Sequence, residues 1–267
     1  MAGILNIQLK SLPGDKETNL RKIEYYIRFN SDKRLDLVVM PEFFATNIDY
    51  VNNAEDENGG ETIKFIQKLA KQYNTNIVAG SVVRKVGECL YNTSFAIDRM
   101  GEIVAKYDKI HLYNYLGGNE GSKTTEGKKI VTASFDFAKV GLAICFDVRY
   151  PQMFRELARQ GVHIITLPTA WLVSKEVYED EASKKYARDM WLAMNRTRAY
   201  DNMVYYVVSD QTKNASDSRY GLGGSAIISP TAQVLAYEEE KEGAIYAEID
   251  VQEVKYLKSI YPITSID

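Results

Sequence analysis

One stretch decides the fold: KVGLAICFDVRYPQMFRELARQGVHIITLPTAW, residues 139–171, which changes character abruptly at Cys145. Before the cysteine, residues 140–144 form a short apolar run rich in branched side chains. Such a run is typical of a strand that is buried on both faces. The polar residues that follow it indicate a turn, so we expect Cys145 at the end of this strand.

The rest of the stretch predicts a helix and a second strand. Pro151 suits the first turn of a helix, where its missing N–H would have no partner anyway. Apolar side chains then recur at helical spacing over residues 153–158, and Gly161 can end the helix. A second apolar run covers residues 162–167. Strand, turn, helix and strand in this order predict two parallel strands joined by a right-handed crossover.

The position of Cys145 admits two interpretations. A free cysteine is most often a small buried hydrophobic residue. A cysteine at a strand end, however, is held by rigid elements and points into the crevice where open α/β sheets bind their ligands. Cys145 is therefore a candidate nucleophile that other residues must support.

Composition predicts a single globular α/β domain over residues 1–267. The chain is 45% hydrophobic and 26% charged, with a net charge of -3. Because the basic residues form no stripe, we expect no nucleic-acid partner. The first residues, MAGILNIQLK, lack the pattern of a signal peptide. No apolar run approaches the ~20 residues that span a bilayer, so we expect no membrane partner.

Cysteine and histidine usage predicts a cytoplasmic protein without a metal or another cofactor. Cys89 and Cys145 are too few for a disulfide framework, and neither has a C-x-x-C partner. Cys89 lies beside a turn and is expected to be structural or exposed. His111 and His163 are the only histidines, which argues against a histidine-rich zinc site.

A glutamate follows a second buried strand. Residues 35–40 read as a central strand, Pro41 stops it, and Glu42 comes directly afterwards. An isolated glutamate at such a point is usually a surface carboxylate. The flanking Val, Met and Phe side chains argue against that, because a buried carboxylate costs several kcal/mol unless it is paired or protonated.

A lysine follows a third strand. Lys109 comes just after IVAKY and opens a glycine-rich loop, residues 108–129, that is too long for a mere connection. Solvation is the usual fate of a lysine at a loop start, but apolar Ile110 and Leu112 follow this one. Glu120 lies within the same loop and would be unremarkable alone.

The remaining chain predicts further strands and one charged helix. Turns at 85–88 and 99–102 indicate hairpins, so we expect mixed sheets. The charged insert at 174–189 is expected to form a solvated helix or loop, or, less favoured, a lid over the site. Near the C-terminus, EEEKEG between QVLAY and GAIYAEI is interpreted as a hairpin connection.

Several of these segments together resemble the nitrilase, or carbon–nitrogen hydrolase, superfamily. The resemblance covers nearly the whole chain and is carried by VVMPEFF, YDKIHLY, GLAICFDVRYP, LPTAW, RAYDN and GGSAIISP. It implies a four-layer α-β-β-α sandwich of two mixed β-sheets and a homodimer. It also implies that Glu42 is general base and acid, Lys109 stabilises the oxyanion, Cys145 is the nucleophile, and Glu120 orients the lysine and the base.

These roles make chemical sense. A thiol with a pKa of about 8.5 is mostly protonated at neutral pH, and a buried glutamate can accept its proton. Lys109 and the backbone N–H of Phe146 can then stabilise the oxyanion. Trp171 is expected to contact the substrate. Asp147 and Arg149 are interpreted as a structural ion pair.

The sequence thus predicts an amidase that releases ammonia from a small linear amide, with an ω-amide of a dicarboxylic acid as the expected type. Nitrile or N-carbamoyl hydrolysis is the alternative within the family. A silent binding protein with the same fold is another, although the intact Glu42, Lys109 and Cys145 argue against it. A Cys-His hydrolase that uses His111 or His163 is a further alternative.

Overall fold

Two stacked β-sheets form the centre of the computed structural model, which describes residues 1–213 and 219–263. The strand orders are β14-β1-β2-β3-β4-β5 in the first sheet and β13-β12-β10-β8-β7-β6 in the second. Each sheet combines parallel and antiparallel pairs, as the sequence predicts. The first sheet contains β1 (Ala2–Gln8), β2 (Leu37–Val39), β3 (Asn76–Val86), β4 (Cys89–Ile97), β5 (Ile103–Asp108) and β14 (Gly243–Ile249). The second contains β6 (Val131–Ser134), β7 (Lys139–Leu142), β8 (Ile164–Pro168), β10 (Tyr205–Ser209), β12 (Ser225–Ile228) and β13 (Val234–Glu238).

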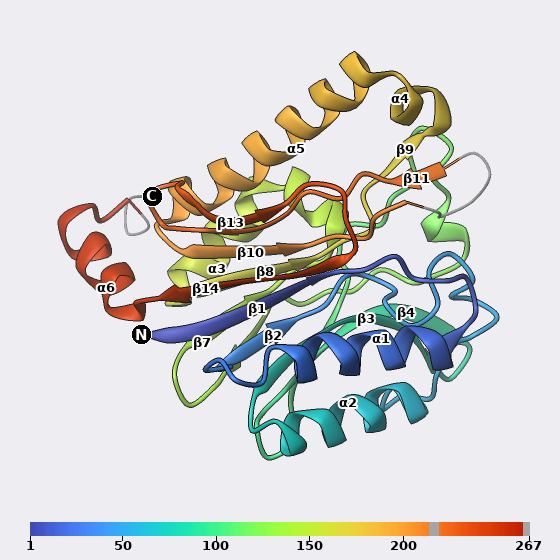
Figure 1. Cartoon of the computed structure of the whole chain (residues 1–267), viewed down its shortest axis with the longest axis horizontal. Coiled ribbons are helices and arrows are strands. Elements are labelled where there is room, and N and C mark those ends of the chain that lie inside the picture. Colours follow the sequence, from blue (N-terminus) through green and yellow to red (C-terminus); the bar gives the residue numbers. More distant parts are fainter. Residues whose placement is uncertain (214–218, 264–267) are drawn as a thin grey trace.

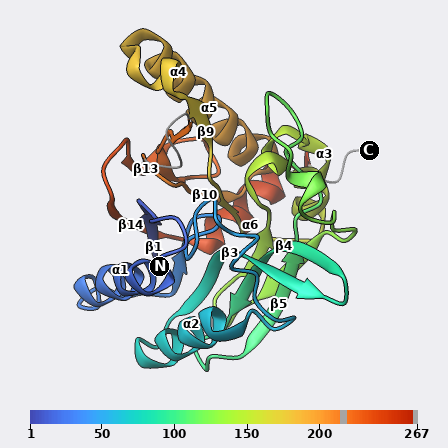
Figure 2. The same cartoon turned by 90° about the vertical axis from the view of Figure 1, so that its right-hand side faces the viewer.

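Helices cover the outer face of each sheet. Helices α1 (Lys16–Phe29) and α2 (Gly60–Gln72) pack on the first sheet, and α3 (Pro151–Arg159) and α5 (Glu181–Asn202) lie over the second (Figure 1). Strand β1 contacts β10 and β12 across the space between the sheets. The expected four-layer α-β-β-α sandwich is therefore confirmed. The remaining described strands, β9 (Leu172–Ser174) and β11 (Arg219–Gly221), form a separate ribbon (Figure 1). The remaining described α-helices are α4 (Lys175–Glu179) and α6 (Val251–Ile260) (Figure 2).

Alternation along the strands separates two apolar cores. In β2, Leu37 and Val39 belong to the cluster between the sheets, whereas Val38 belongs to the cluster beneath α1 and α2. Ile23 and Ile27 of α1, one helical turn apart, belong with Val38 to the cluster beneath α1 and α2. Side chains point to opposite faces along a strand, so a sheet covered on both sides needs apolar residues at every position.

The crossover predicted for residues 139–171 is confirmed. Strand β7 pairs in parallel with β8, and α3 connects them. Pro151 occupies the first turn of α3, and Gly161, with φ of 80°, follows the end of the helix. Glycine suits that left-handed conformation because it has no Cβ.

The segment EEEKEG at 238–243 is not a hairpin, so that prediction is wrong. Strand β13 pairs with β12 in the second sheet, whereas β14 pairs with β1 in the first. The segment therefore carries the chain from one sheet to the other. An alternating apolar pattern indicates that a strand has a buried face but does not say which strand it pairs with.

The charged insert is helical, as expected, but only partly solvated. It contains α4 and the beginning of α5, and Tyr178, Lys184 and Arg188 are buried. The guanidinium of Arg188 donates to the carbonyl of Leu222 and pairs with two glutamates, at positions 239 and 240. A buried arginine is acceptable here because carboxylates and a carbonyl satisfy it. Within the described residues, no helix is both long and apolar enough to cross a membrane.

Candidate active site

The ends of three strands carry the predicted site residues, and these strands belong to different sheets. Glu42 follows β2 and Lys109 follows β5, both in the first sheet, whereas Cys145 follows β7 in the second. Glu120 lies in a short 3₁₀ turn, Glu120–Ser122, of the long loop after β5. All four side chains are buried, with at most 7% of each residue exposed.

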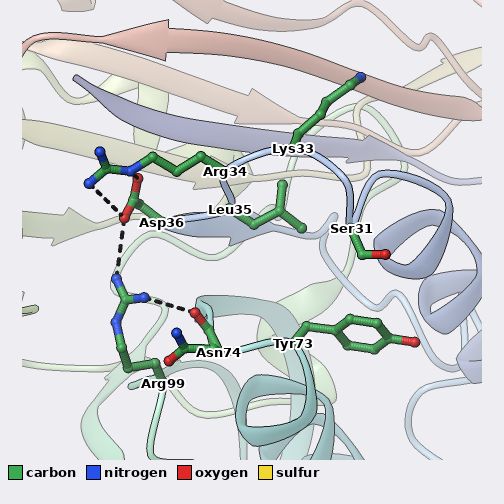
Figure 3. Close-up of a pocket in the computed structure, with 8 residues that line it drawn as sticks. All are labelled: Ser31, Lys33, Arg34, Leu35, Asp36, Tyr73, Asn74 and Arg99. Atoms are coloured by element: carbon green, nitrogen blue, oxygen red, sulfur yellow. Dashed lines mark hydrogen bonds and ion pairs between the residues drawn. The ribbon is translucent and has the colours of Figure 1, made fainter.

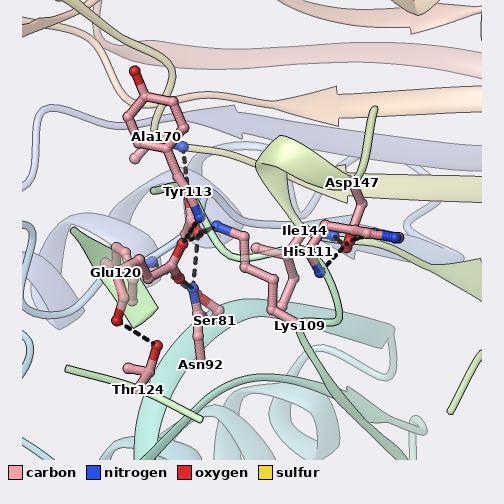
Figure 4. A network of polar contacts seen from close by, with 12 residues as sticks. Ser81, Asn92, Lys109, His111, Tyr113, Glu120, Thr124, Ile144, Asp147 and Ala170 are labelled. Carbon is pink, nitrogen blue, oxygen red and sulfur yellow. Dashed lines mark hydrogen bonds and ion pairs between the residues drawn. The ribbon is translucent and has the colours of Figure 1, made fainter. Parts of the chain in front are cut away.

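Lys109 lies between the two glutamates. Its amine donates to Glu42 Oε1 at 2.9 Å and to Glu120 Oε2 at 2.8 Å, and Figure 4 shows it pointing toward Glu120. Burial alone would lower the pKa of Lys109, but the charges of Glu120 and Glu42 outweigh it and raise this pKa well above its usual value. The lysine is therefore a fixed positive charge.

The two carboxyl groups have pKa values that shift in opposite directions. Burial raises the pKa of Glu42, and the charge of Lys109 only partly offsets this. Burial also acts on Glu120, but there Lys109 and the N–H of Tyr113, 2.8 Å from Oε2, lower the pKa below its usual value. Glu42 also accepts the N–H of Ala170 at 2.9 Å. Carboxyl groups with diverging pKa values can divide acid–base work, so Glu42 is suited to carry a proton and Glu120 to stay charged.

Cys145 occupies a strained position at the start of a second 3₁₀ turn, Cys145–Arg149. Its φ of 47° is uncommon for a residue with a side chain, and such strain clusters at functional sites. Burial, followed by the charge of Glu42, raises the pKa of the Cys145 thiol well above its usual value, although Lys109 opposes this. The thiol is therefore protonated at rest, and it could act as a nucleophile only if a base accepted its proton.

Asp147 joins the cysteine turn to the lysine loop. One carboxylate oxygen accepts the hydroxyl of Tyr107 at 2.7 Å and the N–H of Ile144 at 2.8 Å. The other oxygen, Oδ1, accepts the backbone N–H of His111 at 3.1 Å and lies 2.7 Å from the ring Nδ1 of the same histidine (Figure 4). The prediction of an ion pair between Asp147 and Arg149 is therefore wrong. Arg149 is exposed, and the fully buried Asp147 pairs with His111 instead.

The histidines do not form a Cys-His pair of the kind considered from the sequence. His163 precedes β8, and its backbone N–H donates to the backbone carbonyl of Lys139 at the beginning of β7. Cys145 follows the other end of β7, so His163 lies at the far end of the sheet. The ring of His111 is held by Asp147 and stacks on the ring of Tyr150, with the two ring centroids 3.5 Å apart.

A cavity of about 760 Å³ opens beside Cys145. Trp171 lines this cavity, and its ring stacks on that of Trp191 with the ring centroids 4.4 Å apart. The backbone N–H of Trp171 donates to Asp210 Oδ1 at 2.9 Å. Phe146 also lines it, and the first N–H groups of a helical turn have no partner within the turn. The other lining residues are mostly apolar or aromatic with two arginines: Tyr113, Tyr115, Leu116, Arg149, Tyr150, Ala170, Leu172, Val173, Ser174, Val177 and Arg219.

A second, smaller cavity of about 380 Å³ lies elsewhere (Figure 3). It is lined by Arg34, Asp36 and Arg99, and the aspartate pairs with both arginines. Asp36 precedes β2 and Glu42 follows it, so this cavity is at the opposite end of the strand from the buried glutamates. Its charges are largely compensated within the chain.

Three polar residues of the site escaped the sequence analysis. Asn92 of β4 donates to both Glu42 and Glu120. Asp210 holds the N–H of Trp171, and Gln211 donates to the carbonyl of Glu42 at 2.8 Å. The available signal was a polar residue within an apolar strand, LYNTSFAI, or directly after one, VVSDQ. Among the described residues, no group of three or more His, Cys, Asp or Glu side chains is arranged to hold a metal ion.

Comparison with known proteins identifies the family. The family model for carbon–nitrogen hydrolases matches residues 6–259. A deaminated glutathione amidase from Synechocystis is 30% identical over 96% of this chain and 94% of its own length. A 2-oxoglutaramate amidase from Bacillus subtilis is 29% identical over 94% and 91%. The crystal structure of yeast Nit3, a nitrilase superfamily member, superimposes with a TM-score of 0.84 at 25% identity, covering 99% of this chain and 95% of that one. The chain therefore belongs to the carbon–nitrogen hydrolase family and is a hydrolase of non-peptide carbon–nitrogen bonds.

Proposed function

We propose that this enzyme hydrolyses the terminal amide of a small linear monoamide of a dicarboxylic acid, through a thioester on Cys145. One observation carries the proposal. Cys145 lines a cavity of about 760 Å³ that is also lined by Arg149 and Arg219, while its acid–base partners Glu42 and Lys109 are buried. The cavity thus offers a nucleophile and a means of holding a carboxylate.

Acylation begins with a neutral thiol. As Sγ of Cys145 attacks the amide carbon, its proton passes to Glu42, whose raised pKa makes it a stronger base than an ordinary carboxylate. The developing oxyanion is stabilised by the ammonium of Lys109 and the backbone N–H of Phe146, each such donor contributing about 3 kcal/mol. Glu42 returns the proton to the departing nitrogen, the C–N bond breaks, and ammonia leaves.

Deacylation repeats the cycle with water. Glu42 takes a proton from a water molecule as the water oxygen attacks the thioester carbon, and Lys109 and the backbone N–H of Phe146 again stabilise the oxyanion. The C–S bond then breaks, the thiol of Cys145 is re-formed with the proton from Glu42, and the carboxylic acid leaves. Glu120 stays ionised throughout and holds Lys109 in place.

The arginines support a substrate with a second carboxylate. Arg149 is exposed and lines the cavity, and Arg219, which also lines it, donates to the carbonyl of Leu116 at 2.6 Å. A guanidinium binds carboxylates in a planar, two-point fashion. The name of the Bacillus relative, a 2-oxoglutaramate amidase, describes an amide of this type.

The test compares matched substrates. Ammonia release is measured for monoamides of four- and five-carbon dicarboxylic acids and for neutral amides of equal length. We expect the monoamides to have the higher kcat/KM, and Arg149→Met to remove about 10- to 100-fold of it for them only, because a hydrogen bond to a charged group contributes about 1.5–3 kcal/mol. Equal losses for charged and neutral amides would refute the carboxylate site.

The same panel includes nitriles and N-carbamoyl compounds of matched length. A clear preference for either would replace the proposed substrate class by the alternative within the family. Purified protein that binds monoamides without releasing ammonia would instead indicate a silent binding protein.

We also propose that the enzyme is a homodimer in a reducing cytoplasm and needs no cofactor. The free thiol of Cys89 is exposed, which suits a reducing compartment. Analytical ultracentrifugation checks the dimer, and a monomer at micromolar concentration would overturn it. Cell fractionation checks the location.

A further inference from the structure

Asn92 forms hydrogen bonds with all three charged residues of the candidate site: Glu42, Lys109 and Glu120. It lies in β4, opposite Val83 of β3, and is fully buried. Its side-chain nitrogen donates to Glu42 Oε1 at 2.8 Å and to Glu120 Oε1 at 2.9 Å. Its backbone carbonyl accepts the N–H of Lys109 at 2.9 Å.

These bonds close a ring. Starting at the amine of Lys109, the ring runs through Glu42 Oε1, the amide nitrogen of Asn92 and the carboxylate of Glu120, and returns to the amine. Figure 4 shows Lys109, Asn92 and Glu120 close together. The two N–H bonds of one amide have a fixed angle between them, so they set the spacing of the carboxylates. A neutral side chain with two donors on one atom is found only in asparagine and glutamine.

We propose that Asn92 is a positioning residue that spaces Glu42 and Glu120 around Lys109 and so keeps the carboxylate of Glu42 available as a base. The catalytic meaning of this role rests on the function proposed above. The ring geometry itself does not depend on the substrate.

The strand alone does not require an asparagine at this position. Backbone bonds pair β4 with β3 and β5 whatever the side chain, and the buried part of β4 continues with Thr93 and Ser94 and then the apolar Phe95, Ala96 and Ile97. A polar side chain that is fully buried costs free energy unless its bonds are made. The side-chain nitrogen of Asn92 makes two bonds, and both end on carboxylates of the site, whereas its Oδ1 has no hydrogen-bond partner among the described residues.

The first test is Asn92→Ala, read as a pH profile. Glu42 loses a donor that favours its charged form, so its pKa rises and the acid limb of kcat/KM moves to higher pH by about one unit. The groups that act electrostatically with Glu42 remain in the variant: Lys109, Glu120, Cys145, Asp210 and Tyr50. A residue that only supports the fold would lower activity without moving the limb.

A chemical probe makes the result independent of any substrate. In a Cys89→Ser background, which removes the other thiol, the rate of alkylation of Cys145 by iodoacetamide is measured against pH. We expect its midpoint to move upward by about one unit in Asn92→Ala and by less in Asn92→Ser, which keeps one donor. Asn92→Asp places a third acid against two carboxylates, so we expect a loss of alkylation of about 100-fold at neutral pH.

Ser94→Ala is the matched control. Ser94 is two residues along the same strand, on the same face and equally buried, and no hydrogen bond to its hydroxyl is formed within the described structure. We expect it to leave the midpoint unchanged. A midpoint that stays constant in folded Asn92→Ala or Asn92→Ser, or that moves equally in Ser94→Ala, would overturn the inference. If no amide is hydrolysed but the alkylation midpoint moves, the proposed function fails and the role of Asn92 stands.

Discussion

Removing the charge of Lys109 tests the electrostatics of the site most directly. Lys109 is 2% exposed and bonds to two carboxylates at 2.9 and 2.8 Å, so solvent screens these contacts little. Deleting one partner of a buried ion pair costs about 3–5 kcal/mol because the remaining charge stays buried. We expect Lys109→Ala to lower the free energy of unfolding at pH 8 by this amount, a large part of the ~5–15 kcal/mol of a typical domain.

The loss of stability caused by Lys109→Ala should be smaller at low pH than at high pH. Burial is the largest effect on the pKa of both Glu42 and Glu120, and the charge of Lys109 is the largest effect that opposes it. Without the ammonium, we therefore expect the folded-state pKa values of both carboxyl groups to lie above their unfolded values. Each carboxyl then favours the folded state when protonated, and this contribution is lost as the pH rises through the folded-state pKa. The difference between wild type and Lys109→Ala should therefore be smaller at pH 5.5 than at pH 8.

Urea denaturation followed by tryptophan fluorescence measures this difference at both pH values. Lys106→Ala is the control, because Lys106 lies on β5, three residues before Lys109, but bonds at the surface to Asn58. We expect it to cost less than about 1 kcal/mol. Turnover of Lys109→Ala should fall by about 10²–10³, and Lys109→Arg should lose nearly as much because its planar group is bulkier. A penalty below about 1 kcal/mol at both pH values would refute the buried charge network.

Three further predictions concern the cysteine turn and the base. Cys145→Ser should abolish turnover with the fold retained, whereas Cys89→Ser should be nearly silent; ammonia assays with circular dichroism check this, and equal losses in both variants would contradict it. Glu42→Gln should block acylation as well as deacylation, so rapid-quench experiments should find no thioester; a trapped acyl-enzyme formed at the normal rate would exclude Glu42 as the base for attack. Asp147→Asn places an amide nitrogen against N–H and O–H donors of the cysteine turn and lysine loop, so we expect about 1–3 kcal/mol lower stability and a kcat reduced more than KM is raised; unchanged kcat in the folded variant would show that this joint does not position the nucleophile.

The sequence by itself determined the elements whose signals are local. Residues 139–171 predicted a strand, a turn, a helix and a parallel strand, and all are present because apolar runs, Pro151 and Gly161 act on their own neighbourhood. The same kind of reasoning located Glu42, Lys109 and Cys145 at three strand ends. A polar residue directly after an apolar run is easy to recognise in a sequence. It also marks the carboxyl end of a buried strand, where open α/β sheets bind their ligands.

Only the tertiary structure decided which elements and polar groups meet. The pairing of β14 with β1 replaced the expected hairpin, since a pattern with a period of two fixes a buried face but no partner. Asp147 bonds to His111 across 36 positions of sequence, and Asn92 reaches Glu42 across 50. A polar residue in a strand looks the same in the sequence whether it faces water or a buried carboxylate, and the difference arises only when distant segments pack together and exclude water.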